Sequence, residues 1–473
     1  MSGLLSISSS GGGSNNASPI ISNLRVDGKI GLDSFTIKYT AEDFENTILR
    51  HYISINSEKK EITKELGYES SNNEFTYALS GLQQGTNYNV QIEVTDGVNV
   101  VNSSINVKTL EKPQIYGVKV MENNSNPNSC CTYIEDAVGI SVATPTSLGG
   151  WANKFPFDKI RIVGFKNGQV TKEIKKDNKA QYTDGSTVPT DVDVMVEIPK
   201  VYWKFTNIEN GYELRISDTK INNGYDCYAH KVGGVEKDFI YVGAYLGYNQ
   251  SGKLRSRSGV SPTVSQTLTQ FRQQAQANGS GYQQWNWFTL ILLQNLYLIA
   301  YKNLNSQSAL GYGYANGNSS KANTGGTNTK GFIYGETSGK QQMCFLGIED
   351  FYGNLWQWVD GMYFDGSKIL VVPDNKKFND NRSGFVSVGN ASTVSNGKIS
   401  KVIGTSQGGF FPKQCSGSDT TYYCDYGYAS SGCFAMFGGY WYYGLNAGAF
   451  YLDVSYSASI SYSDLGSRLV FLG

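Results

Sequence analysis

The sequence predicts a multidomain fold: an all-β sandwich, a β-rich connecting region and a larger α+β domain. Apolar and polar residues alternate in short runs over residues 18–110, as they do in the half-buried strands of a sandwich. The chain holds 54 glycines but only 10 prolines in 473 residues, which favours strands joined by tight turns. Helical periodicity marks two later segments, which begin near Ser265 and Trp287. A chain of this length has room for about two to four domains.

The N-terminal part consists of a tail and the sandwich. Residues 1–17 are rich in Gly, Ser and Asn, a composition that predicts a flexible tail. Within residues 18–110, one strand face is predicted to carry Phe35, Ile37 and Tyr39. The run Leu82-Gln-Gln-Gly-Thr-Asn-Tyr-Asn-Val-Gln-Ile-Glu-Val94 resembles the start of strand F in fibronectin type III domains, where a Tyr hydroxyl closes a corner. The resemblance implies a fibronectin III/Ig-like sandwich that acts as a spacer, with Tyr88 as the corner residue.

Residues 111–189 form the predicted β-rich connecting region. It begins after the break at Glu111-Lys112-Pro113 and mixes Gly/Asn/Ser turns with short strands such as residues 160–163. The third domain is predicted to span residues 190–473. Its first two strands are nearly continuous apolar runs, so they are expected to be buried: residues 194–203 and 239–245.

Two helices are predicted within the third domain. The first has Ser265 as its N-cap and ends near Gly279. Its inward face consists of Leu268, Phe271 and Ala275. The second runs from about Trp287 to Lys302, and its leucines are expected to be largely buried.

Charge and hydropathy exclude several classes of partner. Lys+Arg and Asp+Glu number 40 each, so a net charge of zero provides no long-range attraction for nucleic acid. The most apolar stretch, residues 288–300, contains Gln294 and Asn295 and is too short to cross a bilayer, so no membrane insertion is expected. The N-terminus lacks a basic region followed by an apolar core, so no signal peptide is expected. A protein of this kind, made in the cytoplasm and active outside the cell, would leave by lysis or as part of a particle.

The seven cysteines form no recognisable framework. Their number is odd, no CxxC pair occurs, and a disulfide framework is unusual in so long a chain. Reduced thiols are therefore expected. The remaining candidates for a disulfide are Cys415, Cys424 and Cys433.

The strongest local signature is Gly347-Ile-Glu-Asp-Phe-Tyr-Gly-Asn-Leu-Trp-Gln-Trp-Val-Asp-Gly361. Within it, Gly353 permits a tight turn and Asn354 can hydrogen-bond the local backbone, while Trp356 and Trp358 fall on one strand face. Two motifs follow, Phe437-Gly-Gly-Tyr-Trp441 and Gly466-Ser-Arg-Leu-Val470. In this order the three resemble the D-x-x-GNVWEW, R-G-G-S-W and G-F-R-L elements of the formylglycine-generating-enzyme branch of the C-type lectin fold. The resemblance implies an α+β C-type lectin fold over residues 190–473.

The catalytic residues of that branch are missing. Formylglycine-generating enzymes need a redox-active cysteine pair before the closing strand, whereas residues 444–468 contain no cysteine. Two histidines, His51 and His230, are too few for a His-based triad or a multi-His metal site. Three carboxylates could form a pair for glycosidic cleavage, but in the family that the sequence resembles their positions hold turns and loops: Glu349, Asp350 and Asp360. We therefore predict no enzymatic activity, no catalytic residue, no metal and no cofactor, with a formylglycine-type oxidoreductase that uses a rearranged cysteine pair as the alternative.

The C-terminal segment is rich in tyrosine. Ten of the 33 tyrosines fall between Thr421 and Ser463, where the chain average predicts about three. Tyr beside Ser, Gly and Asn is typical of antibody binding loops, because Tyr gives a large amphipathic contact area at low entropic cost. The segment resembles the lectin-like domains of phage tail and cell-surface proteins that diversity-generating retroelements rewrite at chosen codons. Composition and resemblance together predict an exposed, variable, ligand-binding face: Tyr426, Tyr428, Tyr440, Tyr442, Tyr443, Asn446, Tyr451, Asp453, Ser455, Tyr456, Ile460, Tyr462 and Asp464.

The alternative for this segment is a Tyr-rich β core with partly buried hydroxyls. The nonpolar alternation of a buried strand fails between Asp453 and Asp464, which favours exposure. The sequence therefore predicts a receptor-binding tail-fibre or tail-tip protein of a phage or prophage particle, located in the virion. Its expected partners are a host cell-surface protein or glycan and other phage tail proteins, and a homotrimer is expected by analogy with tail fibres. A bacterial surface adhesin, which needs a secretion route, is the remaining alternative.

Overall fold

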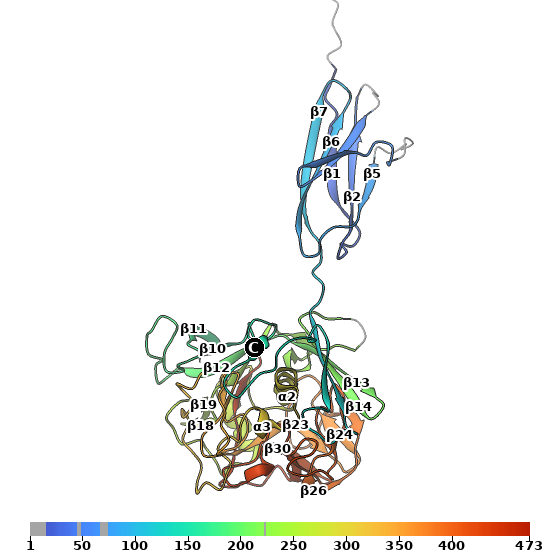
Figure 1. Ribbon diagram of the computed structural model, residues 1–473. Helices are drawn as coiled ribbons and strands as arrows, with labels where there is room; N and C mark the ends of the chain where they lie inside the picture. Colours follow the sequence, from blue (N-terminus) through green and yellow to red (C-terminus); the bar gives the residue numbers. More distant parts are fainter. Residues whose placement is uncertain (1–15, 45–48, 67–73, 222–223) are drawn as a thin grey trace, which may run out of the picture. The chain divides into compact units, whose positions relative to one another are not determined.

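The computed structural model describes residues 16–44, 49–66, 74–221 and 224–473, which divide into two compact units (Figure 1). One unit comprises Met1–Pro113 and the other Gln114–Gly473. Strands dominate both units, so the predicted multidomain, β-rich architecture is confirmed in outline. Most of the predicted flexible tail, residues 1–17, lies outside the described residues. No helix in the described ranges is long and apolar enough to span a membrane.

The first unit is a sandwich of two antiparallel sheets, with strand orders β1-β2-β5 and β4-β3-β6-β7. The strands are β1 (Ile20–Asp27), β2 (Phe35–Glu42), β3 (Arg50–Ile55), β4 (Glu58–Glu61), β5 (Glu74–Leu79), β6 (Asn87–Thr95) and β7 (Val100–Lys108). The predicted inward face of β2 is confirmed, because Phe35, Ile37 and Tyr39 are buried in the sandwich core. The Tyr88 hydroxyl accepts a hydrogen bond from the backbone N–H of Gln83 at 2.7 Å, which is the corner contact that the sequence predicted.

The second unit contains three larger sheets. Their strand orders are β13-β14-β8-β9, β11-β10-β12-β17-β33-β20 and β25-β24-β23-β30-β31-β29-β26, and β32 pairs with β23. The strands of these sheets are β8 (Ile115–Met121), β9 (Cys131–Glu135), β10 (Arg161–Lys166), β11 (Gln169–Ile174), β12 (Asp193–Pro199), β13 (Tyr202–Ile208), β14 (Gly211–Ser217), β17 (Phe239–Gly243), β20 (Tyr282–Gln284), β23 (Trp356–Phe364), β24 (Lys368–Val371), β25 (Val386–Asn390), β26 (Val394–Lys398), β29 (Tyr426–Ala429), β30 (Cys433–Phe437), β31 (Leu452–Tyr456), β32 (Leu465–Gly466) and β33 (Leu469–Phe471). Short two-stranded ribbons complete the unit: β15 (Lys231–Val232) with β16 (Val235–Glu236), β18 (Gly247–Gln250) with β19 (Lys253–Ser256), β21 (Cys344–Phe345) with β22 (Ile348–Glu349), and β27 (Lys401–Val402) with β28 (Pro412–Gln414).

The structure places no boundary at residue 189, where the sequence predicted one. β8 pairs with β14 from Ile115 opposite Ser217 to Met121 opposite Gly211. β10 likewise pairs with β12. The strands of the predicted connecting region therefore belong to the sheets of the second unit. The local sequence of a strand does not show which distant strand it pairs with. The prediction from sequence therefore separates residues 111–189 from the sheets to which they belong.

Both predicted helices are present, as α1 (Leu268–Gln276) and α2 (Trp287–Tyr301), and a short α3 (Ser306–Ala309) follows. The three predicted inward residues of α1 are buried. The predicted cap at Ser265 is wrong, since the N-cap is Thr267. Thr267 Oγ1 accepts the N–H of Gln270, and the Gln270 side chain accepts the N–H of Thr267. This reciprocal capping box satisfies two backbone donors at once.

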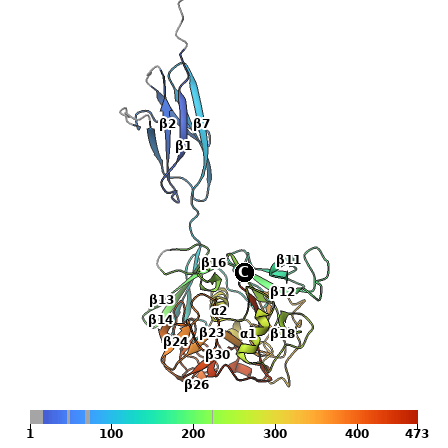
Figure 2. The ribbon, with the colours of Figure 1, turned by 180° about the vertical axis from the view of Figure 1, so that it is seen from behind.

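The helix α2 lies in the middle of the second unit in both views (Figures 1 and 2). Every residue of α2 is buried, which fits a helix that is apolar all round. In both views β26 and β30 lie at one end of the unit, and β12 and the C-terminus lie toward the other end. The Tyr-rich segment packs on a core cluster that contains Trp356, Trp358 and Phe434.

Candidate ligand-binding site

Two of the three motifs of the second unit, the Gly347–Gly361 signature and the closing Gly466–Val470 strand, meet at the side chain of Arg468, which has no exposed surface. Its Nη2 donates to the carbonyl oxygens of Glu349 and Asp350 at 2.7 and 2.8 Å. Its Nε donates to Gln357 Oε1 at 3.0 Å, and its Nη1 donates to the carbonyl oxygen of Gly243 at 2.9 Å. The closing strand is thereby fixed to the Gly347–Gly361 signature by charge-assisted hydrogen bonds.

The signature turn holds the loop that carries Tyr440 and Tyr442. Gly353 has a φ of +78°, as expected of a glycine in a tight turn, and its N–H donates to Gly438 at 3.2 Å. The N–H of Trp441 donates to the carbonyl oxygen of Asn354, also at 3.2 Å. The predicted turn is therefore confirmed, and it anchors the Tyr-rich loop to the frame.

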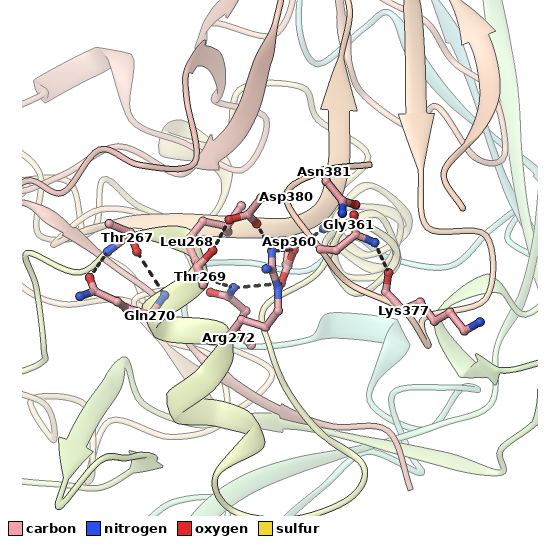
Figure 3. A network of polar contacts seen from close by, with 12 residues as sticks. Thr267, Leu268, Thr269, Gln270, Arg272, Asp360, Gly361, Lys377, Asp380 and Asn381 are labelled. Atoms are coloured by element: carbon pink, nitrogen blue, oxygen red, sulfur yellow. Dashed lines mark hydrogen bonds and ion pairs between the residues drawn. The ribbon is translucent and has the colours of Figure 1, made fainter. Parts of the chain in front are cut away.

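A second polar network joins α1 to the same frame (Figure 3). The Arg272 guanidinium makes a bidentate ion pair with Asp360, with N–O distances of 2.7 and 2.9 Å, and its Nη2 also contacts Asp380 at 2.7 Å. The Thr269 hydroxyl donates to the other oxygen of Asp380. These contacts connect β23 and the loop around residue 380 to α1.

The carboxylates considered for glycosidic cleavage are enclosed in the fold. Glu349 is fully buried and accepts the N–H groups of Gly325 and Thr327, each at 2.7 Å. Burial, reinforced by the charge of Glu349, raises the pKa of Asp350 to about 8. Asp360 is held by Arg272. All three side chains are buried, and they stabilise turns inside the fold.

All seven cysteines are free thiols, so none of the candidate disulfides is formed. Six are buried and Cys415 is partly buried. Burial raises the pKa of Cys415 to about 12, and burial followed by the charge of Asp425 raises that of Cys424 to about 12. Cys130 and Cys131 have sulfur atoms 3.6 Å apart, but they lie before the signature, not between it and the closing strand. Burial also raises the pKa of Cys131, Cys227, Cys344 and Cys433, which is opposite to the lowered pKa of a reactive cysteine.

The remaining candidates for metal or acid–base chemistry are occupied by internal partners. His51 is buried in the sandwich with its Nδ1 2.9 Å from the Tyr39 hydroxyl, and His230 is buried in the second unit. Within the described ranges, one group of potential metal ligands comes together: Asp226, Cys227 and Glu236. Lys231 already contacts Asp226 at 2.5 Å, and Lys220 contacts Glu236 at 3.0 Å. Ammonium groups thus neutralise both carboxylates.

The structure brings most of the predicted tyrosines together on one core cluster. Four of them, with Ile460, are partly buried against the cluster that contains Trp356: Tyr426, Tyr440, Tyr443 and Tyr456. Tyr442 and Tyr462 are more exposed, at 65% and 45%. We give the name aromatic face to six exposed or half-exposed tyrosines: Tyr426, Tyr440, Tyr442, Tyr443, Tyr456 and Tyr462.

Ring contacts connect the aromatic face to the buried rings beneath it. The ring of Tyr443 lies 4.6 Å from that of Tyr440 and 5.5 Å from that of Trp356, between centroids. Trp356 in turn lies 4.6 Å from Tyr451. Tyr456 and Tyr462 form a separate edge-to-face pair at 5.6 Å. Such pairs fix the orientation of half-exposed rings, because each pair prefers a particular geometry.

Two predicted binding residues lie in the interior instead. Tyr451 is 2% exposed and Asp453 is 8% exposed, so the prediction of exposure is wrong for both. Asp453 lies in β31, and Tyr451 directly precedes this strand. β31 is a central strand, paired with β30 on one side and β29 on the other. Protein covers this part of β31, so burial here does not require nonpolar alternation. From Ser455 onward the segment is at least partly exposed up to Asp464.

The remaining predicted residues lie around this region. Asn446, Ser455 and Asp464 are partly exposed. Tyr428 lines a recess of about 570 Å³ together with residues 393–396, at the start of β26.

A second recess, of about 440 Å³, borders the Tyr-rich segment at Ser457–Ser459. Its other walls come from residues that the sequence prediction missed: Thr267, Thr269, Tyr363, Asp380, Arg382, Gly432 and Phe434. The guanidinium carbon of Arg382 lies 4.8 Å from the Tyr363 ring centroid, and its Nη1 donates to the Tyr363 hydroxyl at 2.9 Å. These residues come from four separate segments, and no local motif marks any of them.

No protein-family model matches the chain, and no curated protein matches it. Among solved structures, the chain is similar to the Major Tropism Determinant M1 variant, at 13% identity and a TM-score of 0.26, over 82% of this chain and 81% of that chain. The I1 variant gives 13% identity, a TM-score of 0.26 and 82% coverage of each chain. The P3c variant gives 12% identity, a TM-score of 0.25 and 82% coverage of each chain. A likeness of this degree carries no argument about the fold or function of this chain.

Proposed function

We propose that the chain is a receptor-binding protein of a phage or prophage particle, and that its aromatic face binds a host-surface protein or glycan. In this proposal the second unit is a C-type-lectin-fold domain whose Tyr-rich positions vary through a retroelement. The first unit is a fibronectin type III-like spacer, and the particle presents the chain as a homotrimer beside other tail proteins.

One observation carries the proposal: half-exposed tyrosines are seated on a rigid, buried aromatic cluster. Tyr443 contacts Trp356 beneath it, and Trp356 contacts the buried Tyr451. Rings held in this way lose little conformational entropy when a partner binds, so they can contribute much of the binding free energy. The serines and Asn446 around them supply adaptable hydrogen bonds.

The thiols and carboxylates support a binding role that involves no covalent step. The cysteine pair of a formylglycine-type enzyme is missing from the segment before the closing strand. Among the described residues, the buried carboxylates of the signature hold loops through backbone N–H groups and Arg272. Repetition of a weak site on a particle would raise avidity by about 10²–10⁴ where the geometry allows simultaneous contacts.

The test is binding of the labelled full-length chain to a panel of bacterial isolates. The parent is compared with a variant in which Tyr442, Tyr443 and Tyr456 are changed together to Ala. A control variant changes Tyr52 and Tyr77, two partly exposed tyrosines of the first unit. We expect the control to bind like the parent and the triple variant to lose affinity by at least about tenfold.

Two results would contradict the proposal. Equal binding by the triple variant would show that the aromatic face is not the docking surface. Oxygen-dependent oxidation of a Cys-containing peptide by the purified chain would show that it is an oxidoreductase.

A further inference from the structure

The recess beside Ser457–Ser459 is continuous with the aromatic face. The ring of Tyr363, in the wall of the recess, lies 5.1 Å from the ring of Phe434 between centroids. Phe434 on β30 lies opposite Tyr456 on β31 in the sheet, and Tyr456 belongs to the aromatic face. Ser457, which lines the recess, directly follows Tyr456 in the chain. A ligand that covers Tyr456 can therefore also enter the recess.

The recess is lined by two charged side chains, a carboxylate that is fully engaged and a guanidinium that is not. Both oxygens of Asp380 have partners, Arg272 at 2.7 Å and the Thr269 hydroxyl (Figure 3). Arg382 is exposed, donates one hydrogen bond to the Tyr363 hydroxyl and has no carboxylate partner within the described ranges. The Tyr363 ring lies against the same guanidinium, 4.8 Å from its central carbon. The recess therefore holds an oriented positive charge, and most of its N–H donors are left for a ligand.

Three hydroxyl groups of the recess can also donate hydrogen bonds to a ligand. Thr267 Oγ1 accepts the N–H of Gln270, which leaves the hydroxyl proton for another partner. The hydroxyls of Ser457 and Ser459 lie 2.8 Å apart, and the one that accepts from the other keeps its own proton to donate. The available groups are thus mostly donors, while the one carboxylate is occupied. The recess therefore favours a ligand that carries a negative charge and several acceptor oxygens.

A sugar acid has this combination of groups. Its carboxylate can bind a guanidinium through two parallel hydrogen bonds, and its ring hydroxyls can both accept and donate. The recess volume of about 440 Å³ lies in the range of small-molecule sites, about 300–1,000 Å³. The carboxylate of an Asp or Glu side chain alone would fill only a small part of it. The size therefore favours a sugar ring over an acidic side chain of a protein.

We propose that this recess binds a uronic acid unit of a host-surface glycan, with Arg382 as the partner of the sugar carboxylate. The hydroxyls of Thr267, Ser457 and Ser459 bind the hydroxyl oxygens of the same sugar. Tyr363 is a positioning residue, because its ring and hydroxyl hold the guanidinium in place. The inference rests on the proposed receptor-binding function and identifies the class of ligand.

The test uses the full-length chain and titrations followed by saturation-transfer NMR at pH 7.5. The probes are the methyl glycosides of glucuronic, galacturonic and mannuronic acid, each compared with the methyl glycoside of its parent hexose. The two members of a pair differ only at C6, where one has a carboxylate and the other a hydroxymethyl group. We expect at least one acid to bind, with an affinity at least about fivefold higher than that of its parent sugar.

The variant Arg382→Met provides the decisive comparison. It removes the guanidinium, so we expect the preference for the acid over the parent sugar to fall below about twofold. Arg25→Met, at an exposed arginine of the first unit, is the matched control and should keep the full preference. Tyr363→Phe keeps the ring and removes the hydroxyl that accepts from Arg382, so its preference should lie between those of the parent and Arg382→Met. Thermal unfolding checks that the variants are folded, and Arg382→Lys, which loses the planar fork, replaces Arg382→Met if the latter is not.

Three outcomes would overturn the inference. The first is equal binding of every acid and its parent sugar, and the second is a preference for the acid that survives unchanged in the folded Arg382 variant. The third is tighter binding of inorganic phosphate or N-acetyl-glutamate amide than of every uronide, which would indicate a phosphate group or an acidic side chain of a protein as the ligand. Any of them can occur while the triple Tyr variant still loses cell binding, in which case the receptor-binding proposal stands and only the sugar-acid site fails. If the triple variant keeps cell binding, the receptor-binding proposal itself fails, and this inference fails with it.

Discussion

The ring of Tyr443 lies against the ring of Tyr451, with centroids 5.7 Å apart and planes inclined by 41°. One of these tyrosines is half-exposed and the other is buried. The pair therefore separates two roles that a count of tyrosines cannot distinguish: a ring that a partner can touch and a ring that supports it.

The first prediction is that a buried and an exposed tyrosine of this region contribute differently to the free energy of unfolding. Tyr451→Ala removes a buried ring from the core cluster and should lower the free energy of unfolding by about 3–5 kcal/mol. Tyr442→Ala removes an exposed ring and should change it by less than about 0.5 kcal/mol. Urea unfolding of the two variants measures both values. Equal effects would mean that the two rings do not differ in burial.

The second prediction concerns pH and Asp453. Because burial raises the folded-state pKa of this carboxyl from about 3.8 to about 6, the folded protein holds the proton more tightly than the unfolded chain does. The contribution of Asp453 to stability therefore falls as pH rises from about 4 to about 6, by on the order of 3 kcal/mol. Asp453→Asn should be more stable than the parent at pH 7.5 and close to it at pH 4.5, as measured by urea unfolding at both values. A variant less stable than the parent at pH 7.5 would contradict the assignment.

The third prediction concerns Arg468. Replacing it by Met leaves four buried hydrogen-bond acceptors without a donor, which should cost at least about 3 kcal/mol. The matched control is Arg382→Met, at an exposed arginine with one hydrogen bond, where we expect about 1 kcal/mol or less. Thermal or urea unfolding distinguishes the two. Equal losses would show that Arg468 does not fix the closing strand to the Gly347–Gly361 signature.

The fourth prediction concerns the thiols. Burial raises the pKa of Cys227 to about 11, in addition to the effects at Cys415 and Cys424. A thiol reagent such as DTNB should therefore react very slowly with the native chain at pH 8, and with all seven cysteines after unfolding in denaturant. Rapid reaction of two thiols in the native chain would favour the oxidoreductase alternative.

The elements that sequence reasoning placed correctly are those with strong local signals. The alternation around Ile37, the apolar run of α2 and the Trp356–Trp358 pair each specify an element and the burial of its side chains. The Gly347–Gly361 signature also identified the turn at Gly353, because few residues other than glycine adopt its backbone angles.

The features that sequence reasoning missed depend on contacts between distant segments. Tyr451 and Asp453 resemble their neighbours in sequence, and only the pairing of β31 with β29 and β30 makes them internal. The pairing of β8 with β14 merges the predicted connecting region with the second unit in the same way. The recess walls at Thr267 and Arg382 likewise come together only in the folded chain.

The most direct test of the aromatic face is hydroxyl-radical footprinting of the full-length chain, free and bound to cells of an isolate that it recognises. We expect Tyr442, Tyr456 and Tyr462 to be oxidised in the free chain and protected in the bound one. Tyr451 should be unreactive in both states, and Tyr52 should react equally in both. Protection confined to the first unit, with the tyrosines of the aromatic face still reactive, would contradict the account.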